Sequence, residues 1–146
     1  MKRCHFNSWV AKVFLSPSYQ AITLLYNSFF KHKVEECKPE GINHERIHQV
    51  QQIECSIAGL ILDIILWLLF DISFWWVVAM IFGFFYLWYV IEYLIILCFA
   101  KWDKQNERYH DVSFEEEAHN NDKNPSYLED RKPFAWIKYI KLRSYK

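Results

Sequence analysis

The longest stretch without basic residues constrains the fold of this chain most. Residues 57–100 contain no Lys or Arg and are almost entirely apolar. Their acidic residues are Asp63, Asp71 and Glu92. The stretch is about twice as long as the ~20 residues that one bilayer crossing needs. Residues 70–73 (FDIS) supply turn and N-cap residues within it and are its natural break. We therefore expect two helices, over residues 43–70 and 73–101, that form a transmembrane hairpin.

The alternative to a membrane hairpin is a buried hairpin in a soluble protein. A soluble helix shows one polar face, and residues 74–100 lack the alternation that such a face requires. Aromatic residues make up 19% of the chain, and Trp and Tyr collect at membrane interfaces. All 17 Lys and Arg lie outside residues 57–100, so the positive-inside rule predicts that both termini are cytoplasmic. We expect an integral protein of the bacterial inner membrane, with the lipid bilayer as a partner.

Charge and cysteine content exclude other classes of protein. The chain carries 17 basic and 17 acidic residues, and this balance argues against nucleic acid as a partner. The four cysteines form no CxxC pair, so neither a zinc ribbon nor a redox site is indicated. We do not expect a cleaved signal peptide, because Lys12, Pro17 and Gln20 interrupt the apolar residues near the start.

A motif typical of zinc hydrolases lies at the start of the first expected helix, in residues 44–48 (HERIH). Residues four apart lie on one face of a helix, so His44 and His48 can direct two imidazoles at one metal ion. Zinc lowers the pKa of its bound water towards about 7, and Glu45 lies where its carboxylate can take the proton. The spacing therefore indicates a Zn²⁺ site with Glu45 as general base. The alternative is a polar helix start whose histidines are solvated.

A catalytic zinc ion needs a third protein ligand. The acidic candidates are Glu54, Glu115 and Glu117. Glu54 follows six residues after His48 and would reach the metal only if a glycine turn ended the helix. Gln51 occupies that position, so the helix is expected to continue and turn Glu54 to another face. We exclude Glu54 on this ground.

The other two candidates follow the second expected helix. Residues 113–116 (SFEE) fit a capping box, with Ser113 as the N-cap, and predict a short helix over residues 114–123. Glu115 and His119 would share a face of that helix. Glu117 would point about 200° away from Glu115.

Together, HExxH and an ExxA element on a later helix resemble the gluzincin metallopeptidases, especially their membrane-bound branch of HtpX-like proteases and β-lactam-sensor peptidases. In that family the first Glu of Glu-x-x-Ala-Asp is the third zinc ligand. On residues 115–119 (EEEAH) this position is Glu115. The resemblance thus implies a zinc site of His44, His48 and Glu115. Over nearly its whole length the chain also resembles small, largely uncharacterised bacterial membrane proteins with NHExIHxxQQ, two apolar helices and FExEA.

The chain departs from the gluzincin pattern at His119, where the family has an Asp that orients a ligand histidine. A histidine there could accept the same hydrogen bond or approach the metal itself. Tyr109 and His110 stand just before the short helix, and by resemblance either could stabilise an oxyanion.

Two acids inside the apolar stretch need partners, because an unpaired carboxylate in a membrane is costly. A tight hairpin would place Glu92 near Gln51. Glu92 could then hold His48 or Gln52, or it could lie at the membrane surface and bond to Tyr or water. Asp63 lies deeper, and we expect it to be protonated or to contact another subunit.

The flanks carry weaker patterns. Residues 19–33 are rich in β-branched and aromatic residues and predict a strand or hairpin. In gluzincins an edge strand beside the motif helix binds the substrate backbone, which the resemblance implies here. Residues 131–146 are basic and aromatic and fit a helix on an anionic membrane surface, with a solvated helix as the alternative. The expected apolar stripe of that helix is Phe134, Trp136, Ile137 and Ile140.

We therefore predict one mainly α-helical, membrane-embedded domain of 146 residues. Its expected parts are an N-terminal arm, the helical hairpin, the third-ligand segment and a basic tail, at residues 1–42, 43–101, 102–124 and 125–146. The predicted function is hydrolysis of peptide bonds near the cytoplasmic membrane face. Little chain precedes the motif, so a substrate cleft could need a homo-oligomer or a partner membrane protein. The alternative is a non-enzymatic membrane scaffold or complex subunit, with a structural metal site or none.

Overall fold

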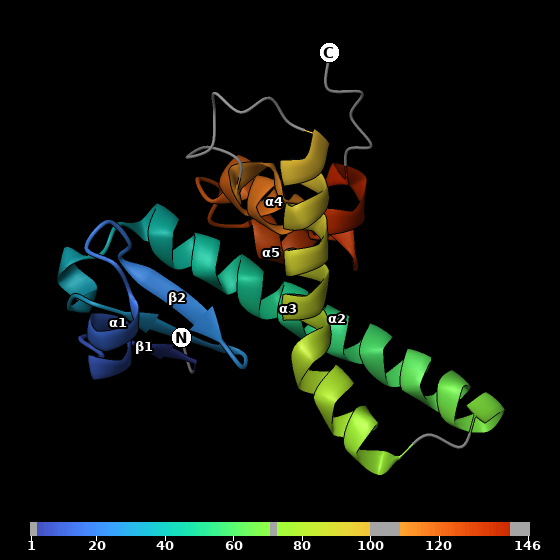
Figure 1. Ribbon diagram of the computed structural model, residues 1–146. Helices are drawn as coiled ribbons and strands as arrows, with labels where there is room; N and C mark the ends of the chain where they lie inside the picture. The colour runs from blue at the N-terminus through green and yellow to red at the C-terminus, as the bar shows by residue number, and fades with distance from the viewer. Residues whose placement is uncertain (1–2, 71–72, 100–108, 141–146) are drawn as a thin grey trace. The chain divides into compact units, whose positions relative to one another are not determined.

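A computed structural model describes residues 3–70, 73–99 and 109–140 (Figure 1). This part of the chain is mainly helical, with two long apolar helices and a small three-stranded sheet. It divides into two compact units. The first unit combines Met1–Val50 with Ala118–Lys132, and the second combines Gln51–Glu117 with Pro133–Lys146.

The sheet of the first unit is built from residues that precede the HExxH motif. Its strands β1 (Cys4–His5), β2 (Ala21–Leu24) and β3 (Asn27–Phe30) lie in the order β1-β3-β2. β2 and β3 form an antiparallel hairpin in which Ala21 pairs with Phe30, whereas β1 is parallel to β3. The hairpin predicted within residues 19–33 is confirmed, and β2 forms one edge of the sheet. β1 and the short helix α1 (Trp9–Phe14) are additional elements.

Helix α2 (Pro39–Phe70) begins four residues before the predicted start, because proline is well suited to the first position of a helix. It then runs unbroken through the HExxH residues and the apolar segment (Figure 1). A three-residue 3₁₀ turn, η1 (Val34–Glu36), precedes it. The continuity of α2 confirms the reason for excluding Glu54. In the second unit, the Glu54 carboxylate accepts a hydrogen bond from the backbone N–H of Phe134 at 2.8 Å.

Helix α3 (Phe74–Phe99) is the second apolar helix. The expected turn at Asp71 lies outside the described residues. α2 and α3 approach each other closely at Gly59, where an added Cβ atom would lie 2.9 Å from the carbonyl oxygen of Met80. One turn earlier, the Ser56 hydroxyl donates to the carbonyl oxygen of Ile81 at 2.6 Å. Small residues at this point thus let the two backbones come together.

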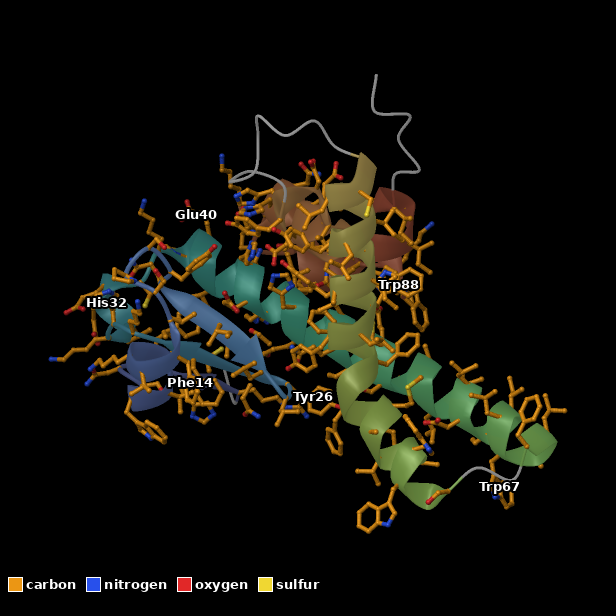
Figure 2. All side chains as sticks on the ribbon, viewed as in Figure 1. Phe14, Tyr26, His32, Glu40, Trp67 and Trp88 are labelled. Carbon is orange, nitrogen blue, oxygen red and sulfur yellow. The ribbon has the colours of Figure 1, made fainter. Side chains whose placement is uncertain are left out.

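The apolar side chains of α2 and α3 face outward. Both helices are long and apolar enough to cross a membrane, yet only 22% and 6% of their most apolar windows are buried. Figure 2 shows side chains that project from α2 around Trp67. A core helix of a soluble protein would bury such residues. The exposed apolar side chains of α3 include Leu87, Val90, Ile91, Leu94 and Ile95.

The core of the second unit joins α3 to α4 (Ser113–Asn121) and to the 3₁₀ helix η3 (Ala135–Tyr139). Phe114 is fully buried and stacks on Phe85, with ring centroids 4.5 Å apart. Trp136 packs against Phe114 and Trp88 and is only 4% exposed. The prediction that Trp136 belongs to an outward apolar stripe is therefore wrong, because this aromatic cluster takes it into the core. Residues 141–146 of the tail lie outside the described residues.

Candidate metal centre

Helix α2 carries the two motif histidines in its second and third turns. Their Nε2 atoms lie 3.1 Å apart, and their ring centroids lie 4.7 Å apart. Two nitrogen ligands of a tetrahedral zinc ion, each at about 2.0–2.1 Å from the metal, lie about 3.4 Å apart. The spacing of His44 and His48 therefore suits two ligands of a single ion.

Residues from the end of α4 and the turn after it lie beside His44. The rings of His44 and His119 have centroids 4.6 Å apart. An oxygen of Asp122 lies 4.0 Å from Nδ1 of His44 and 3.8 Å from Nδ1 of His119. The nearest ligand atoms of these three side chains all lie within 4.8 Å of one another. Imidazole nitrogen and carboxylate oxygen are donors that zinc accepts, so this group can hold a metal ion.

Asn43 attaches this turn to the motif helix. Its side-chain amide donates to the carbonyl oxygens of Asn121, Asp122 and Asn124, at 3.3, 3.0 and 2.8 Å. Sequence reasoning identified neither Asn43 nor Asp122 as a site residue. The available signal for Asn43 was that it is the first residue of the NHExIHxxQQ pattern.

Glu115 lies on α4 one turn before His119. Because α4 is helical throughout Ser113–Asn121, Glu115 and His119 share one of its faces. Within the second unit, the Tyr89 hydroxyl donates to the Glu115 carboxylate at 3.3 Å. Glu117 is fully buried and accepts a hydrogen bond from the Gln51 amide at 3.0 Å.

The sheet holds the carboxylate of Glu45. The Thr23 hydroxyl on β2 donates to Glu45 Oε2 at 2.6 Å, and Ser28 on β3 hydrogen-bonds to Thr23 at 2.7 Å. Glu45 is only 9% exposed. Its carboxylate is therefore fixed in orientation by a neighbour from the N-terminal arm, which the sequence pattern did not identify.

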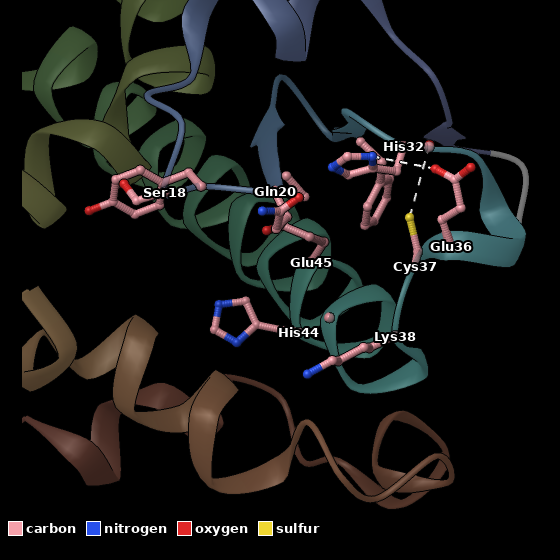
Figure 3. Close-up of a pocket in the computed structure, with 12 residues that line it drawn as sticks. Ser18, Gln20, His32, Glu36, Cys37, Lys38, His44 and Glu45 are labelled. Carbon is pink, nitrogen blue, oxygen red and sulfur yellow. Dashed lines mark hydrogen bonds and ion pairs between the residues drawn. The ribbon is translucent and has the colours of Figure 1, made fainter.

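A pocket of about 670 Å³ opens beside His44 and Glu45 (Figure 3). The segment with Ser18 and Gln20 that leads into β2 lines it as well. Its volume falls in the range of about 300–1,000 Å³ typical of small-molecule sites. The short N-terminal arm thus lines a pocket in the first unit.

Other ionisable groups line this pocket. Nδ1 of His32 lies 3.4 Å from a carboxylate oxygen of Glu36. Burial, together with the charges of Glu36 and Glu35, raises the pKa of the Cys37 thiol. Cys37 therefore stays a protonated thiol at neutral pH, which argues against a role as nucleophile.

Glu92 has partners other than those expected. Its carboxylate accepts hydrogen bonds from the N–H and hydroxyl of Ser113, at 2.9 and 2.7 Å, and from the Trp88 indole at 3.2 Å. Glu92 therefore holds the start of α4 and not His48 or Gln52, whereas its expected contact with water stays a prediction. The Ser113 hydroxyl donates a hydrogen bond to Glu92, and Ser113 is the first residue of α4 rather than the residue before it.

The remaining candidates lie in the second unit. The Gln52 amide donates to the Tyr86 hydroxyl at 3.4 Å. The rings of Tyr109 and His110 have centroids 3.8 Å apart. Asp63 is fully buried on α2, and neither of its carboxylate oxygens has a hydrogen-bond partner among the described residues.

Comparison with known proteins adds no relative. No protein family, curated protein or solved structure matches this chain. The resemblance to gluzincins therefore rests on the residues of the two motifs alone.

Proposed function

We propose that this chain is a membrane-embedded zinc metallopeptidase of gluzincin type, which hydrolyses peptide bonds near the cytoplasmic membrane face. The observation that carries the proposal is the 3.1 Å separation of the His44 and His48 Nε2 atoms, with Glu45 between them in sequence. The pocket beside His44 and Glu45 offers space for a substrate. A substrate backbone would pair with β2, an edge strand of the sheet that is continuous with the lining segment.

His44, His48 and Glu115 would hold the zinc ion. The proposal for Glu115 rests on the resemblance of residues 115–118 (EEEA) to the third-ligand element of gluzincins. Zinc, when bound, would polarise a substrate carbonyl and lower the pKa of water, which makes the water a better nucleophile once a base takes its proton. Glu45 takes a proton from the attacking water and delivers it to the leaving amine. The hydrogen bond from Thr23 holds the Glu45 carboxylate in one orientation for both transfers.

The membrane location is part of the same proposal. The outward apolar faces of α2 and α3 would meet lipid, as large exposed apolar patches on a helix do in membrane proteins. The absence of basic residues from residues 57–100 favours cytoplasmic termini and an inner-membrane location. The motif at the start of α2 would then face the cytoplasm.

Glu45→Gln tests the catalytic proposal in protein purified into lipid nanodiscs. We expect one zinc ion per chain in both proteins, and a loss of at least about 100-fold in hydrolysis of a fluorogenic peptide mixture, because general-base catalysis contributes about 10²–10⁴. Glu40→Gln makes the same change at an exposed position in the first turn of α2 and should leave both properties unaltered. Wild-type protein without zinc, or full activity in Glu45→Gln, would contradict the proposal.

One observation favours a second function. His44, His119 and Asp122 all belong to the first unit, and their ligand atoms lie within 4.8 Å of one another, so they could hold a structural metal ion without Glu45 taking part. A scaffold with such a site would need no catalytic water. In that case His119→Ala should abolish metal binding, and Glu45→Gln should leave the biological function intact.

A further inference from the structure

We propose that Asp122 is a positioning residue, whose carboxylate orients the imidazoles of His44 and His119 through their Nδ1 atoms. This inference deepens the proposed function and rests on it, since it assigns the residue that sets the ring orientation of a zinc ligand.

The two nitrogens of the His44 ring face different partners. Nε2 lies 3.1 Å from Nε2 of His48, and Nδ1 lies 4.0 Å from Oδ2 of Asp122. One edge of the ring is therefore directed at the shared metal position and the other at a carboxylate. Histidine ligands of metals commonly donate their second N–H to a carboxylate, which fixes the tautomer and the orientation of the ring.

The same Asp122 oxygen also lies 3.8 Å from Nδ1 of His119. One carboxylate oxygen thus lies close to both imidazoles, whose rings are already in contact. At 3.8 and 4.0 Å these contacts are longer than a hydrogen bond of about 2.7–3.2 Å, so in this proposal the carboxylate acts on the two imidazoles by electrostatic attraction.

Asp122 is held in place by its backbone and not by its other carboxylate oxygen. Its Oδ1 is buried without a hydrogen-bond partner among the described residues, and the side chain is only 16% exposed. Burying such an oxygen is costly, so the fold must hold Asp122 there by other contacts. The Asn43 amide supplies them through the carbonyl oxygens of Asn121, Asp122 and Asn124. The residue that directly precedes His44 therefore fixes the turn that carries the carboxylate.

Asp122→Asn removes the charge and keeps the shape of the side chain. Full-length protein in nanodiscs is titrated with Zn²⁺ against a competing chelator, and Co²⁺ is used to report the ligand set by its visible absorption. We expect zinc affinity to fall about 10- to 100-fold, the usual effect of losing a partner of a ligand histidine. Stoichiometry and the cobalt spectrum should stay the same, because Asp122 does not touch the metal in this proposal.

Asp130→Asn is the matched control, since Asp130 is an exposed acid of the same unit in the short helix α5 (Tyr127–Asp130). It should bind zinc as the wild type does. Asp122→Glu restores the charge and should recover most of the lost affinity. The melting temperature of each metal-free variant separates a folding defect from a change at the site, and the metal-free Asp122→Asn protein should melt like the wild type.

Each outcome separates this inference from the proposed function. Wild-type zinc affinity in Asp122→Asn overturns the role of Asp122 while the zinc site stands. A changed cobalt spectrum makes Asp122 a ligand and also overturns the inference. Failure of the wild type to bind zinc contradicts both proposals. If His48→Ala loses zinc and Asp122→Asn binds it as the wild type does, the proposed function stands and the role of Asp122 does not.

Discussion

At the scale of single residues, Thr23 contacts the proposed general base directly, since its hydroxyl donates to Glu45 Oε2 at 2.6 Å. A hydrogen bond to a charged group contributes about 1.5–3 kcal/mol. We expect Thr23→Val, which keeps the shape and removes the hydroxyl, to lower kcat/KM for peptide hydrolysis by about 10- to 100-fold, the kinetic equivalent of that energy. Zinc content should stay at one per chain.

Thr23→Ser is the matched variant, because serine retains a hydroxyl at the same position. It should keep most of the activity. Equal activity of Thr23→Val and the wild type would show that the sheet does not orient the general base.

The sequence allowed prediction of those site residues whose relation is set within one helix. His44, Glu45 and His48 are recognisable because helical spacing alone puts them together. Thr23 and Asp122 are not, because their contacts depend on how a strand and a turn pack on α2. Thr23 is separated from Glu45 by 22 positions in the chain, and no pattern in either segment encodes that pairing.

At the scale of elements, the contact between α2 and α3 depends on one glycine. A Cβ atom at Gly59 would lie 2.9 Å from the Met80 carbonyl oxygen and 3.2 Å from Cβ of Phe84, and the Met80 oxygen belongs to the backbone. We expect Gly59→Ala to destabilise the protein by about 1–3 kcal/mol, the usual cost of overpacking. Thermal unfolding in detergent measures it.

Gly83→Ala on α3 is the control for this prediction. A Cβ atom there would meet nothing within 4 Å, so the change should be neutral or stabilise the helix by up to about 1 kcal/mol. Both variants gain the same helix propensity, so their difference isolates the steric contact. Similar melting temperatures would contradict the close approach at Gly59.

Elements with a strong pattern could be predicted, and those that depend on tertiary contacts could not. Hydropathy indicated the two long helices, and β-branched residues indicated the β2–β3 hairpin. β1 has two residues, which is too few to show the alternation of side chains that indicates a strand. Trp136 looked like part of a surface stripe because its neighbours in sequence are apolar, whereas its partners Phe114 and Trp88 come from distant segments.

At the scale of the whole molecule, lipid should cover the outer faces of α2 and α3. Leu87 is 48% exposed near the middle of α3. A lysine near the centre of a membrane helix costs about 2.5–3.5 kcal/mol, so Leu87→Lys should reduce the fraction of protein that stays in the membrane pellet after alkaline carbonate extraction. The wild type should resist extraction.

Val13→Lys provides the comparison. Val13 is 68% exposed on α1, outside both apolar helices. The charge there should leave the membrane fraction unchanged. If Leu87→Lys and Val13→Lys behave alike, or if the wild type is extracted, α3 does not lie in lipid.

The unbroken course of α2 has a consequence for what such an enzyme could cut. A helix rises about 1.5 Å per residue, so the nine steps from His48 to Ile57 amount to roughly 13 Å. If Ile57 marks the edge of the hydrocarbon, the scissile bond must be presented at that height above it. The length of the helix would then set the distance between the bilayer and the bond that is cut. The choice of cleavage site in a substrate would depend on this distance more than on the identity of the flanking residues.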